Sequence, residues 1–354
     1  MRIENSALSR RNFVTTLAAG AGLTLTAGSA SKVATAAAES KREVLVDNTQ
    51  NIFSDGRWNG RPTIKYWRDR YWLFFHTGTE HASDDGRIRV LRSRPKEPAG
   101  WEKIAIIDNY EHNDAEAHVL ATEDGLYVYL VLEAPVEKGG YALGTMVTYS
   151  GDGEKWSTPA PCYQDKFSGW KPVTHKGIHY MPVDTKAGGG WVELIASNNG
   201  VHWEKVSDII KGKVTETSLV FLEDDTCLAV TRQGWVSMAK PPYTEWRNEK
   251  TAYCAGPAVA LIGNTVVAAG RVSAERYPDD QPGGSRTGLF TVNRSTLQLE
   301  WQKNLFSQWG RDVSYPDILT TGDDRALIAW YDGEGYEQGI AKQADIYLAT
   351  LRVV

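Results

Sequence analysis

Two stretches of the chain share one frame: SGDGEKW, from Ser150 to Trp156, and SNNGVHW, from Ser197 to Trp203. Both fit the pattern Ser-x-Asp/Asn-Gly-x-x-Trp. In such a turn the Ser and Asp or Asn side chains accept hydrogen bonds from nearby backbone N–H groups, and Gly adopts positive φ. Sequence repeats with a period of this size are typical of propellers and solenoids. The repeated turn therefore predicts a chain built from successive, similar β-units.

Strand-like runs recur in pairs after residue 40, and each pair is joined by a short polar turn. Almost no segment in this region has helical periodicity. A strand, a short turn and a second strand predict a hairpin. Six hairpins follow one another, over residues 61–76, 116–133, 171–183, 216–233, 256–271 and 314–332.

A third strand and a turn bearing Trp follow most of these hairpins. The Trp residues are Trp101, Trp156, Trp203, Trp246 and Trp301. Four strands and about 40–50 residues make one blade of a propeller, so the sequence predicts an all-β, six-bladed β-propeller as a single domain over residues 39–354. The segments REVLVD near residue 42 and DIYLATLRVV at the C-terminus are expected to pair, which would close the ring and hide the sheet edges.

The N-terminal segment resembles a targeting signal. Arg10-Arg11 precedes an uncharged stretch of small residues, and Ala34-Thr35-Ala36 fits a small-x-small cleavage site. The apolar stretch is too short and too rich in Gly and Thr for a membrane span. These features predict a cleaved twin-arginine export signal over residues 1–38, and hence a periplasmic or extracellular protein.

Composition excludes some classes of partner and leaves others open. The net charge is −5, without the basic stripe of a nucleic-acid-binding protein. The three cysteines allow at most one disulfide, and the chain has no CxxC or HExxH spacing that would indicate zinc. No cofactor or metal site is evident, although a structural calcium ion stays possible. The 13 Trp and 16 Tyr residues fit either a sugar-binding cleft or the ordinary aromatic content of an all-β fold.

The repeated turn resembles the Asp-box of the sialidase superfamily, and the resemblance extends over residues 40–354. It includes the stretches GRIRVLRS, PPYTEW and SYP, which are similar to those of bacterial exo-α-sialidase-like proteins. The order of the candidate site residues also resembles that family: Arg61, Asp85, Glu216, Arg232, Arg271 and Tyr315. The resemblance implies a secreted carbohydrate-active enzyme that acts on an acidic sugar of a glycan or polysaccharide.

In this interpretation the three arginines hold the sugar carboxylate, since a planar guanidinium matches it bidentately. Glu216 would deprotonate Tyr315 for nucleophilic attack, and Asp85, or its neighbour Asp84, would protonate the leaving oxygen. His76 and His81, in the loop that leads to Asp85, are expected to face the cleft and contact substrate.

Two other functions stay open. Propellers also carry polysaccharide lyases, which cleave next to a uronic acid by β-elimination. Here His118 would be the base, paired with Glu116 on one strand face, Tyr180 the acid, and Arg61 or Arg232 the neutralising cation. The third possibility is a carbohydrate-binding propeller without turnover.

Overall fold

All six predicted hairpins are present as antiparallel strand pairs in the computed structural model of the chain. Most inner strands are buried on both faces, because strands of the neighbouring sheets pack against them on either side. The pairs are β2 (Trp58–Trp67) with β3 (Arg70–Gly78); β6 (Asn113–Ala121) with β7 (Leu126–Glu133); β10 (Ser168–Gly169) and β11 (Val173–His175) with β12 (Ile178–Thr185); β15 (Thr217–Phe221) with β16 (Cys227–Thr231); β19 (Ala255–Ile262) with β20 (Thr265–Ser273); and β23 (Asp312–Thr320) with β24 (Arg325–Gly333).

Further strands extend each hairpin into an antiparallel sheet. They are β4 (Arg87–Pro95) and β5 (Glu102–Ile107); β8 (Ala142–Ser150) and β9 (Ala160–Pro161); β13 (Trp191–Ser197) and β14 (Glu204–Lys211); β17 (Trp235–Ala239) and β18 (Arg247–Lys250); β21 (Ser285–Asn293) and β22 (Gln298–Asn304); and β25 (Ala344–Val353) with β1 (Val44–Phe53).

The first and last strands close the ring as the sequence predicts. β1 pairs antiparallel with β25, from Val44 opposite Val353 to Phe53 opposite Ile346. β25 in turn meets β2 at one parallel bridge, Trp58 with Ala344, so that β23-β24-β25 and β2-β3-β4-β5 belong to one eight-stranded sheet. The N-terminal strand therefore completes the C-terminal sheet.

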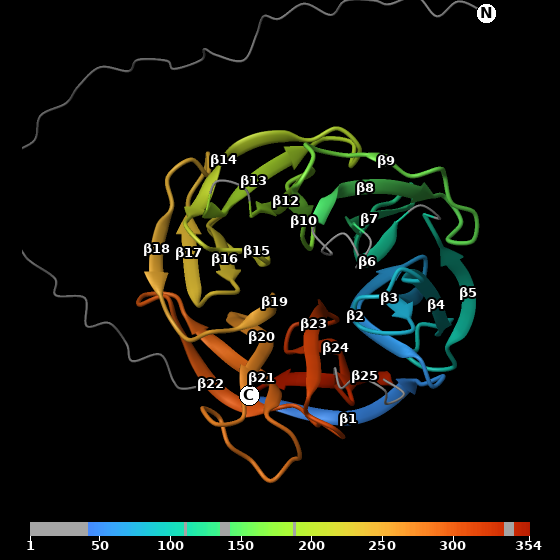
Figure 1. The fold of residues 1–354 in the computed structure, drawn as a ribbon. Coiled ribbons are helices and arrows are strands. Elements are labelled where there is room, and N and C mark those ends of the chain that lie inside the picture. The colour runs from blue at the N-terminus through green and yellow to red at the C-terminus, as the bar shows by residue number, and fades with distance from the viewer. Residues whose placement is uncertain (1–41, 110–111, 135–141, 187–188, 336–342) are drawn as a thin grey trace, which may run out of the picture. The chain divides into compact units, whose positions relative to one another are not determined.

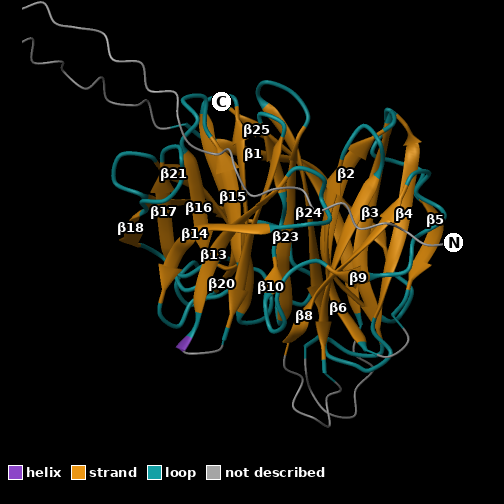
Figure 2. Ribbon diagram, turned by 90° about the horizontal axis from the view of Figure 1, so that it is seen from above, coloured by secondary structure: helices purple, strands orange, loops and turns teal. Residues whose placement is uncertain are grey.

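The sheets surround a common centre, and the innermost strands are β2, β6, β10, β15, β19 and β23 (Figure 1). Viewed at right angles, the strands stand roughly upright and the connecting loops lie mainly at their ends (Figure 2). Successive inner strands contact one another, for example β2 with β6, β15 with β19, and β19 with β23. Apolar side chains fill the wedges between neighbouring sheets. The fold is an all-β propeller whose inner strands bring distant sequence segments together.

The two repeated turns lie between the third and fourth strands of their sheets, away from the centre. Ser150 Oγ accepts a hydrogen bond from Gly153 N at 2.7 Å. Asp152 Oδ1 accepts hydrogen bonds from the backbone amides of Glu154 and Lys155. Ser197 and Asn199 repeat this arrangement. Trp301 departs from the predicted pattern, because it lies inside strand β22 and its ring stacks on Tyr277.

The structure describes residues 42–109, 112–134, 142–186, 189–335 and 343–354. The predicted export signal, residues 1–38, lies outside this part of the chain. This described part belongs to one compact unit, and no helix in it is long and apolar enough to cross a membrane. Cys162, Cys227 and Cys254 are buried and unpaired.

Candidate active site

Four of the innermost segments, three of them strands, carry proline where they pass the centre of the ring. Because proline has no backbone N–H to donate, it interrupts the ladder and favours a bulge, which re-aims the neighbouring side chains. The pairing register shifts at three of these prolines, and the fourth falls in the gap between β10 and β11. The dipeptides are Arg61-Pro62, Lys171-Pro172, Gly256-Pro257 and Tyr315-Pro316.

The backbone is strained at the two bulges that carry Arg61 and Tyr315. Arg61 has φ of 54°, and Ser314 and Tyr315 have φ of 97° and 44°. Residues other than Gly rarely adopt such values, and they cluster at functional sites. Here the strain turns two side chains from different strands toward each other, with the Arg61 guanidinium carbon 5.9 Å from the centroid of the Tyr315 ring.

The hydroxyl of Tyr315 belongs to a three-residue hydrogen-bonded group. It donates to Glu216 Oε1 at 2.7 Å, and Arg232 Nη1 donates to Tyr315 Oη at 3.2 Å. Arg232 also pairs with Glu216 Oε1. Burial, followed by the negative charge of Glu216, raises the pKa of Tyr315 well above its usual range. The phenol is therefore protonated at rest, with a carboxylate in place to accept its proton.

Gly256, in strand β19, holds this group together. Its backbone N–H donates to Glu216 Oε2 at 2.8 Å, which occupies the second carboxylate oxygen. Its φ is +54°, and a Cβ at this position would lie 2.5 Å from Cγ of Tyr315. Only glycine meets both requirements, since it alone tolerates this φ without a side chain in the path of the ring.

All three arginines predicted from the sequence surround Tyr315. The guanidinium carbon of Arg271 lies 5.2 Å from the centroid of the Tyr315 ring, and that of Arg61 also lies over this ring. Arg232 contacts the Tyr315 hydroxyl. Arg61 is the most enclosed of the three, with its side chain 7% exposed. It donates to Ala115 O at 2.6 Å and lies 3.5 Å from Glu116.

Asp312 is a buried hub behind Tyr315. Oδ2 accepts hydrogen bonds at 2.8 Å from Trp58 Nε1 and from His81 Nδ1. Oδ1 accepts from Tyr331 Oη at 2.8 Å and lies 3.6 Å from Arg271. Burial would raise the pKa of Asp312, but these contacts, led by His81, outweigh it and hold the pKa at about 2. Asp312 thereby anchors Arg271 and the β3–β4 loop that carries His81.

The predicted histidines occupy enclosed positions near Arg61 and its partner Glu116. Nε2 of His81 lies 2.6 Å from Arg61 Nη2; because a guanidinium only donates, Nε2 accepts and Nδ1–H donates to Asp312. His76 contacts the backbone oxygen of Asp114, and burial lowers its pKa to about 3. His118 lies 3.4 Å from Glu116 and against the Trp170 ring, and burial lowers its pKa too. These imidazoles are neutral at neutral pH.

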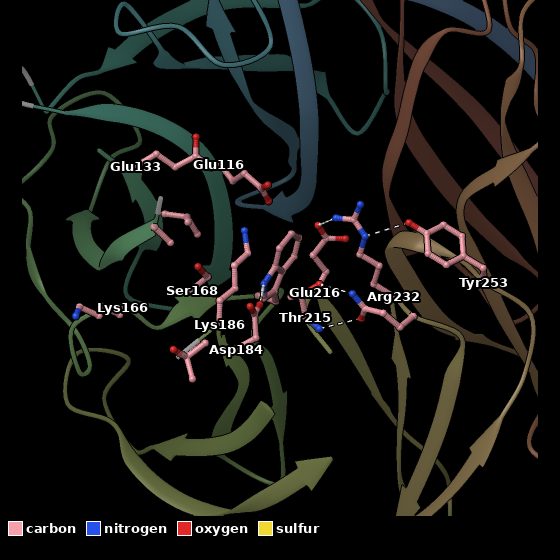
Figure 3. A pocket seen from close by; sticks show the side chains of 15 residues that line it. Glu116, Glu133, Lys166, Ser168, Asp184, Lys186, Thr215, Glu216, Arg232 and Tyr253 are labelled. Carbon is pink, nitrogen blue, oxygen red and sulfur yellow. Dashed lines mark hydrogen bonds and ion pairs between the residues drawn. The ribbon is translucent and has the colours of Figure 1, made fainter. Parts of the chain in front are cut away.

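A cleft of about 800 Å³ opens beside this group, and Figure 3 shows the side chains that line it. Arg232 and Glu216 point toward each other on one wall, with Tyr253 behind Arg232 (Figure 3). The opposite wall carries carboxyl and amino groups. The lining residues are Glu116, Val131, Glu133, Ala142, Lys166, Ser168, Trp170, Asp184, Thr185, Lys186, Thr215, Glu216, Arg232, Gln233 and Tyr253.

Two carboxyl groups in the cleft were missed by the sequence analysis. Burial, with the nearby Glu216 charge, raises the pKa of Asp184 to about 8, and burial raises that of Glu133. Both lie at the ends of second strands, opposite the starts of inner strands: Asn113 pairs with Glu133 and Ser168 with Asp184. Arg232 and Arg271 occupy the same place in their hairpins, opposite the starts of β15 and β19, and this shared position is the sequence signal that points to Asp184 and Glu133.

Of the residues that the sequence predicts to be catalytic or to bind substrate, only Glu216 and Arg232 line the cleft itself. Tyr315, Arg61, Arg271 and the three histidines lie in the enclosed group beside it, and Asp85 and Tyr180 belong to neither. Asp85 is in the β3–β4 loop, where its carboxylate is bound by Arg57 and by the Thr79 amide and hydroxyl. Tyr180 was expected in the cleft, but its ring packs against Phe221 and Tyr243 between neighbouring sheets. It lies four residues before Asp184 on β12, which at about 3.3 Å per residue places it toward the far end of the strand.

No protein-family profile matches the sequence, and no curated protein matches it. Solved structures do match. A protein of unknown function from Dyadobacter fermentans is 15% identical with a TM-score of 0.69, over 88% of this chain and 100% of the other. Phage phi92 endosialidase is 9% identical with a TM-score of 0.66, over 87% and 69%.

The Trypanosoma rangeli sialidase, in complex with 2,3-difluorosialic acid as a covalent intermediate, is 11% identical with a TM-score of 0.60, over 85% of this chain and 59% of the other. This chain therefore spans less than two thirds of that sialidase. At these identities the similarity concerns the fold alone. The protein has an all-β propeller fold similar to that of sialidases.

Proposed function

We propose that this protein is a sialidase-like glycoside hydrolase that acts on an acidic, carboxylate-bearing sugar of a glycan or polysaccharide. The observation that carries the proposal is the hydrogen-bonded group of Tyr315, Glu216 and Arg232 at the edge of the cleft. A tyrosine nucleophile suits such a substrate, because the sugar's carboxylate would repel an Asp or Glu nucleophile.

The reaction uses the contacts of Tyr315 in two steps. In the first, Glu216 Oε1 accepts the phenolic proton, Tyr315 Oη forms a bond to the anomeric carbon, and the bond to the leaving oxygen breaks while that oxygen takes up a proton. In the second, water attacks the same carbon and gives up a proton, the bond from that carbon to Tyr315 Oη breaks, and Glu216 returns its proton so that Tyr315 leaves as the phenol. Two displacements at one carbon retain its configuration.

The three arginines support recognition of the carboxylate. Arg61 and Arg271 approach the Tyr315 ring, and Arg232 approaches its hydroxyl, so positive charge converges where the anomeric carbon would lie. Arg232 is the most open of the three, with its side chain 28% exposed. We assign it the first contact with the substrate carboxylate, with Arg61 and Arg271 providing charge from deeper positions.

The position of Tyr180 favours hydrolysis over elimination. The lyase mechanism needs Tyr180 as the proton donor beside His118, and the structure places Tyr180 in an aromatic cluster between sheets. The hydrolase pair, Glu216 and Tyr315, is in contact.

The test is a panel of substrates offered to the purified protein and to Tyr315→Phe. Methylumbelliferyl sialoside, glucuronide and iduronide report hydrolysis by fluorescence, and uronate polysaccharides report elimination by absorbance near 235 nm. We expect fluorescence with at least one acidic glycoside, and its loss in Tyr315→Phe. A rise at 235 nm without fluorescence would replace the proposal with a lyase. Glycan binding without either signal would indicate a binding propeller.

We also infer a six-bladed propeller of the sialidase superfamily. The eight-stranded sheet contains two antiparallel runs joined by a single parallel bridge, and counting each as a blade gives the six repeats of the sequence. In the described part of the chain, hydrophobic clusters lie between each successive pair of these runs. The Ser150 and Ser197 turns are then Asp-boxes, and residues 1–38 a twin-arginine signal that exports the enzyme.

A further inference from the structure

Asp184 occupies a distinctive place in the cleft. It lies near the end of β12, and its Oδ1 accepts a hydrogen bond from Trp170 Nε1 at 2.5 Å. The Trp170 ring in turn lies 6.3 Å from the Tyr315 ring, centroid to centroid. One indole therefore connects this carboxyl to the nucleophile of the proposed reaction.

Burial and the neighbouring carboxylates favour the protonated form of Asp184, and they outweigh one nearby cation. Glu216 and Glu116 face it with negative charge, and Lys186 faces it with positive charge. Only 5% of Asp184 is exposed to solvent, so water stabilises its carboxylate weakly. Burial is the largest cause of its raised pKa, and Glu216 is the next. Asp184 is accordingly protonated at neutral pH, as a proton donor must be.

Asp85, the donor expected from the sequence, has the opposite environment. Two hydrogen bonds from Thr79 and an ion pair with Arg57 stabilise its carboxylate. Its side chain is 42% exposed and does not line the cleft. Such a carboxyl group gives up its proton readily, and would be ionised when a leaving group needed protonation.

We propose that Asp184 is the general acid of the cleft and protonates the leaving oxygen of the sugar. This inference rests on the proposed hydrolase function. In the first step the Asp184 proton passes to the glycosidic oxygen as its bond to the anomeric carbon breaks. In the second step the Asp184 carboxylate removes a proton from the attacking water and is restored. The two proton transfers balance over one turnover.

Glu133 is the competing carboxyl group in the same cleft. It contacts the Asn113 side chain at 3.2 Å, and its pKa responds to Arg61 and Glu116. No ring contact among the described residues connects it to Tyr315, whereas Trp170 connects Asp184. The structure therefore favours Asp184, and Glu133→Gln serves as the comparison.

The test compares leaving groups on the glycoside hydrolysed by the wild type. A dinitrophenyl leaving group departs without a proton, whereas an alkyl leaving group needs one. For Asp184→Asn we expect kcat/KM for the alkyl glycoside to fall about 100-fold or more, and that for the dinitrophenyl glycoside to fall less than about 10-fold. Asp224→Asn, an exposed aspartate on the β15–β16 turn, is the matched control and should change neither value.

The wild-type pH profile provides a second readout that does not depend on the folding of a variant. Activity on the alkyl glycoside should fall as pH rises through about 8, where Asp184 loses its proton, and activity on the dinitrophenyl glycoside should not. Equal losses on both substrates with no such difference in pH profile would overturn the assignment. The assignment would also be overturned if Asp85→Asn or Glu133→Gln lowered kcat/KM for the alkyl glycoside but not for the dinitrophenyl glycoside. A wild type that hydrolyses neither substrate class would instead remove the proposed function, and this inference with it.

Discussion

The hydroxyl of Tyr315 lies 2.7 Å from Oε1 of Glu216, although 99 residues separate the two in sequence. Glu216 immediately precedes the inner strand β15, and Tyr315 lies at the bulge of β23. The propeller brings both to one side of the cleft, where the remaining oxygen of Glu216 is held by the Gly256 amide. The carboxylate is thus fixed on both sides, with one oxygen directed at the phenol.

Glu216→Gln removes the acceptor for the Tyr315 proton while keeping the shape of the side chain. Loss of a positioned general base lowers rates by about 10²–10⁴-fold, so we expect kcat to fall within that range and the fold to persist. Steady-state kinetics and circular dichroism check the two parts. Unchanged kcat would show that Tyr315 does not depend on Glu216.

Gly256→Ala tests the close packing of the nucleophile. The added Cβ would lie 2.5 Å from Cγ of Tyr315, so the ring must move, and overpacking of this kind costs about 1–3 kcal/mol. We expect lower stability and at least a 10-fold loss of activity.

Gly177→Ala is the matched control for Gly256→Ala. Gly177 also has positive φ, +79°, but nothing lies within 4 Å of an added Cβ. Gly177→Ala should lower the free energy of unfolding only by the backbone strain, about 1 kcal/mol, and should leave activity intact. Equal effects of the two variants in denaturant unfolding and kinetics would contradict the role of the Tyr315 contact.

Asp312 should contribute stability that depends on pH. Its pKa of about 2 lies below the ordinary aspartate value of 3.8, so its contribution is present above pH 4 and is lost as pH falls through 2. A shift of this size corresponds to about 2.5 kcal/mol. The free energy of unfolding of the wild type should therefore fall between pH 4 and pH 2 by about 1.8 kcal/mol more than that of Asp312→Asn, and the rest of the contribution should be lost below pH 2. Parallel curves would refute this account of the hub.

Ser150→Ala tests whether the repeated turn is structural. It removes the acceptor for the Gly153 amide, and a lost hydrogen bond of this kind costs about 1 kcal/mol. Because the turn lies between β8 and β9, away from the cleft, stability should fall while kcat and KM stay unchanged. A change in kcat without a change in stability would place the turn in the functional site.

The sequence was sufficient for the hairpins and for ring closure. Alternating strands and polar turns are local signals, and the pairing of β1 with β25 follows from the need to hide two sheet edges. The residue order that resembles sialidases also brought out Tyr315 and Glu216, which the structure finds in contact. Their catalytic roles stay predictions.

The sequence could not show how far along a strand the cleft lies. Tyr180 and Asp184 share one face of β12, yet only Asp184 lines the cleft. Strand periodicity identifies the face on which a side chain lies, but it does not determine where along the strand the cleft is. Asp184 and Glu133 lie at strand ends, as Arg232 and Arg271 do, but in a sequence a carboxyl group at a strand end reads as solvated until its burial is known.

The most direct test of the central claim is to trap the nucleophile. A 2-fluoro or 3-fluoro glycosyl fluoride of the sugar identified in the substrate panel should react with Tyr315, lose fluoride and leave a glycosyl group on the phenolic oxygen. Peptide mass spectrometry should then find the added mass on the peptide that contains Tyr315, and Tyr315→Phe should carry none. An adduct on a carboxylate residue, or turnover of the fluoride with no adduct on Tyr315, would contradict the assignment of Tyr315 as the nucleophile.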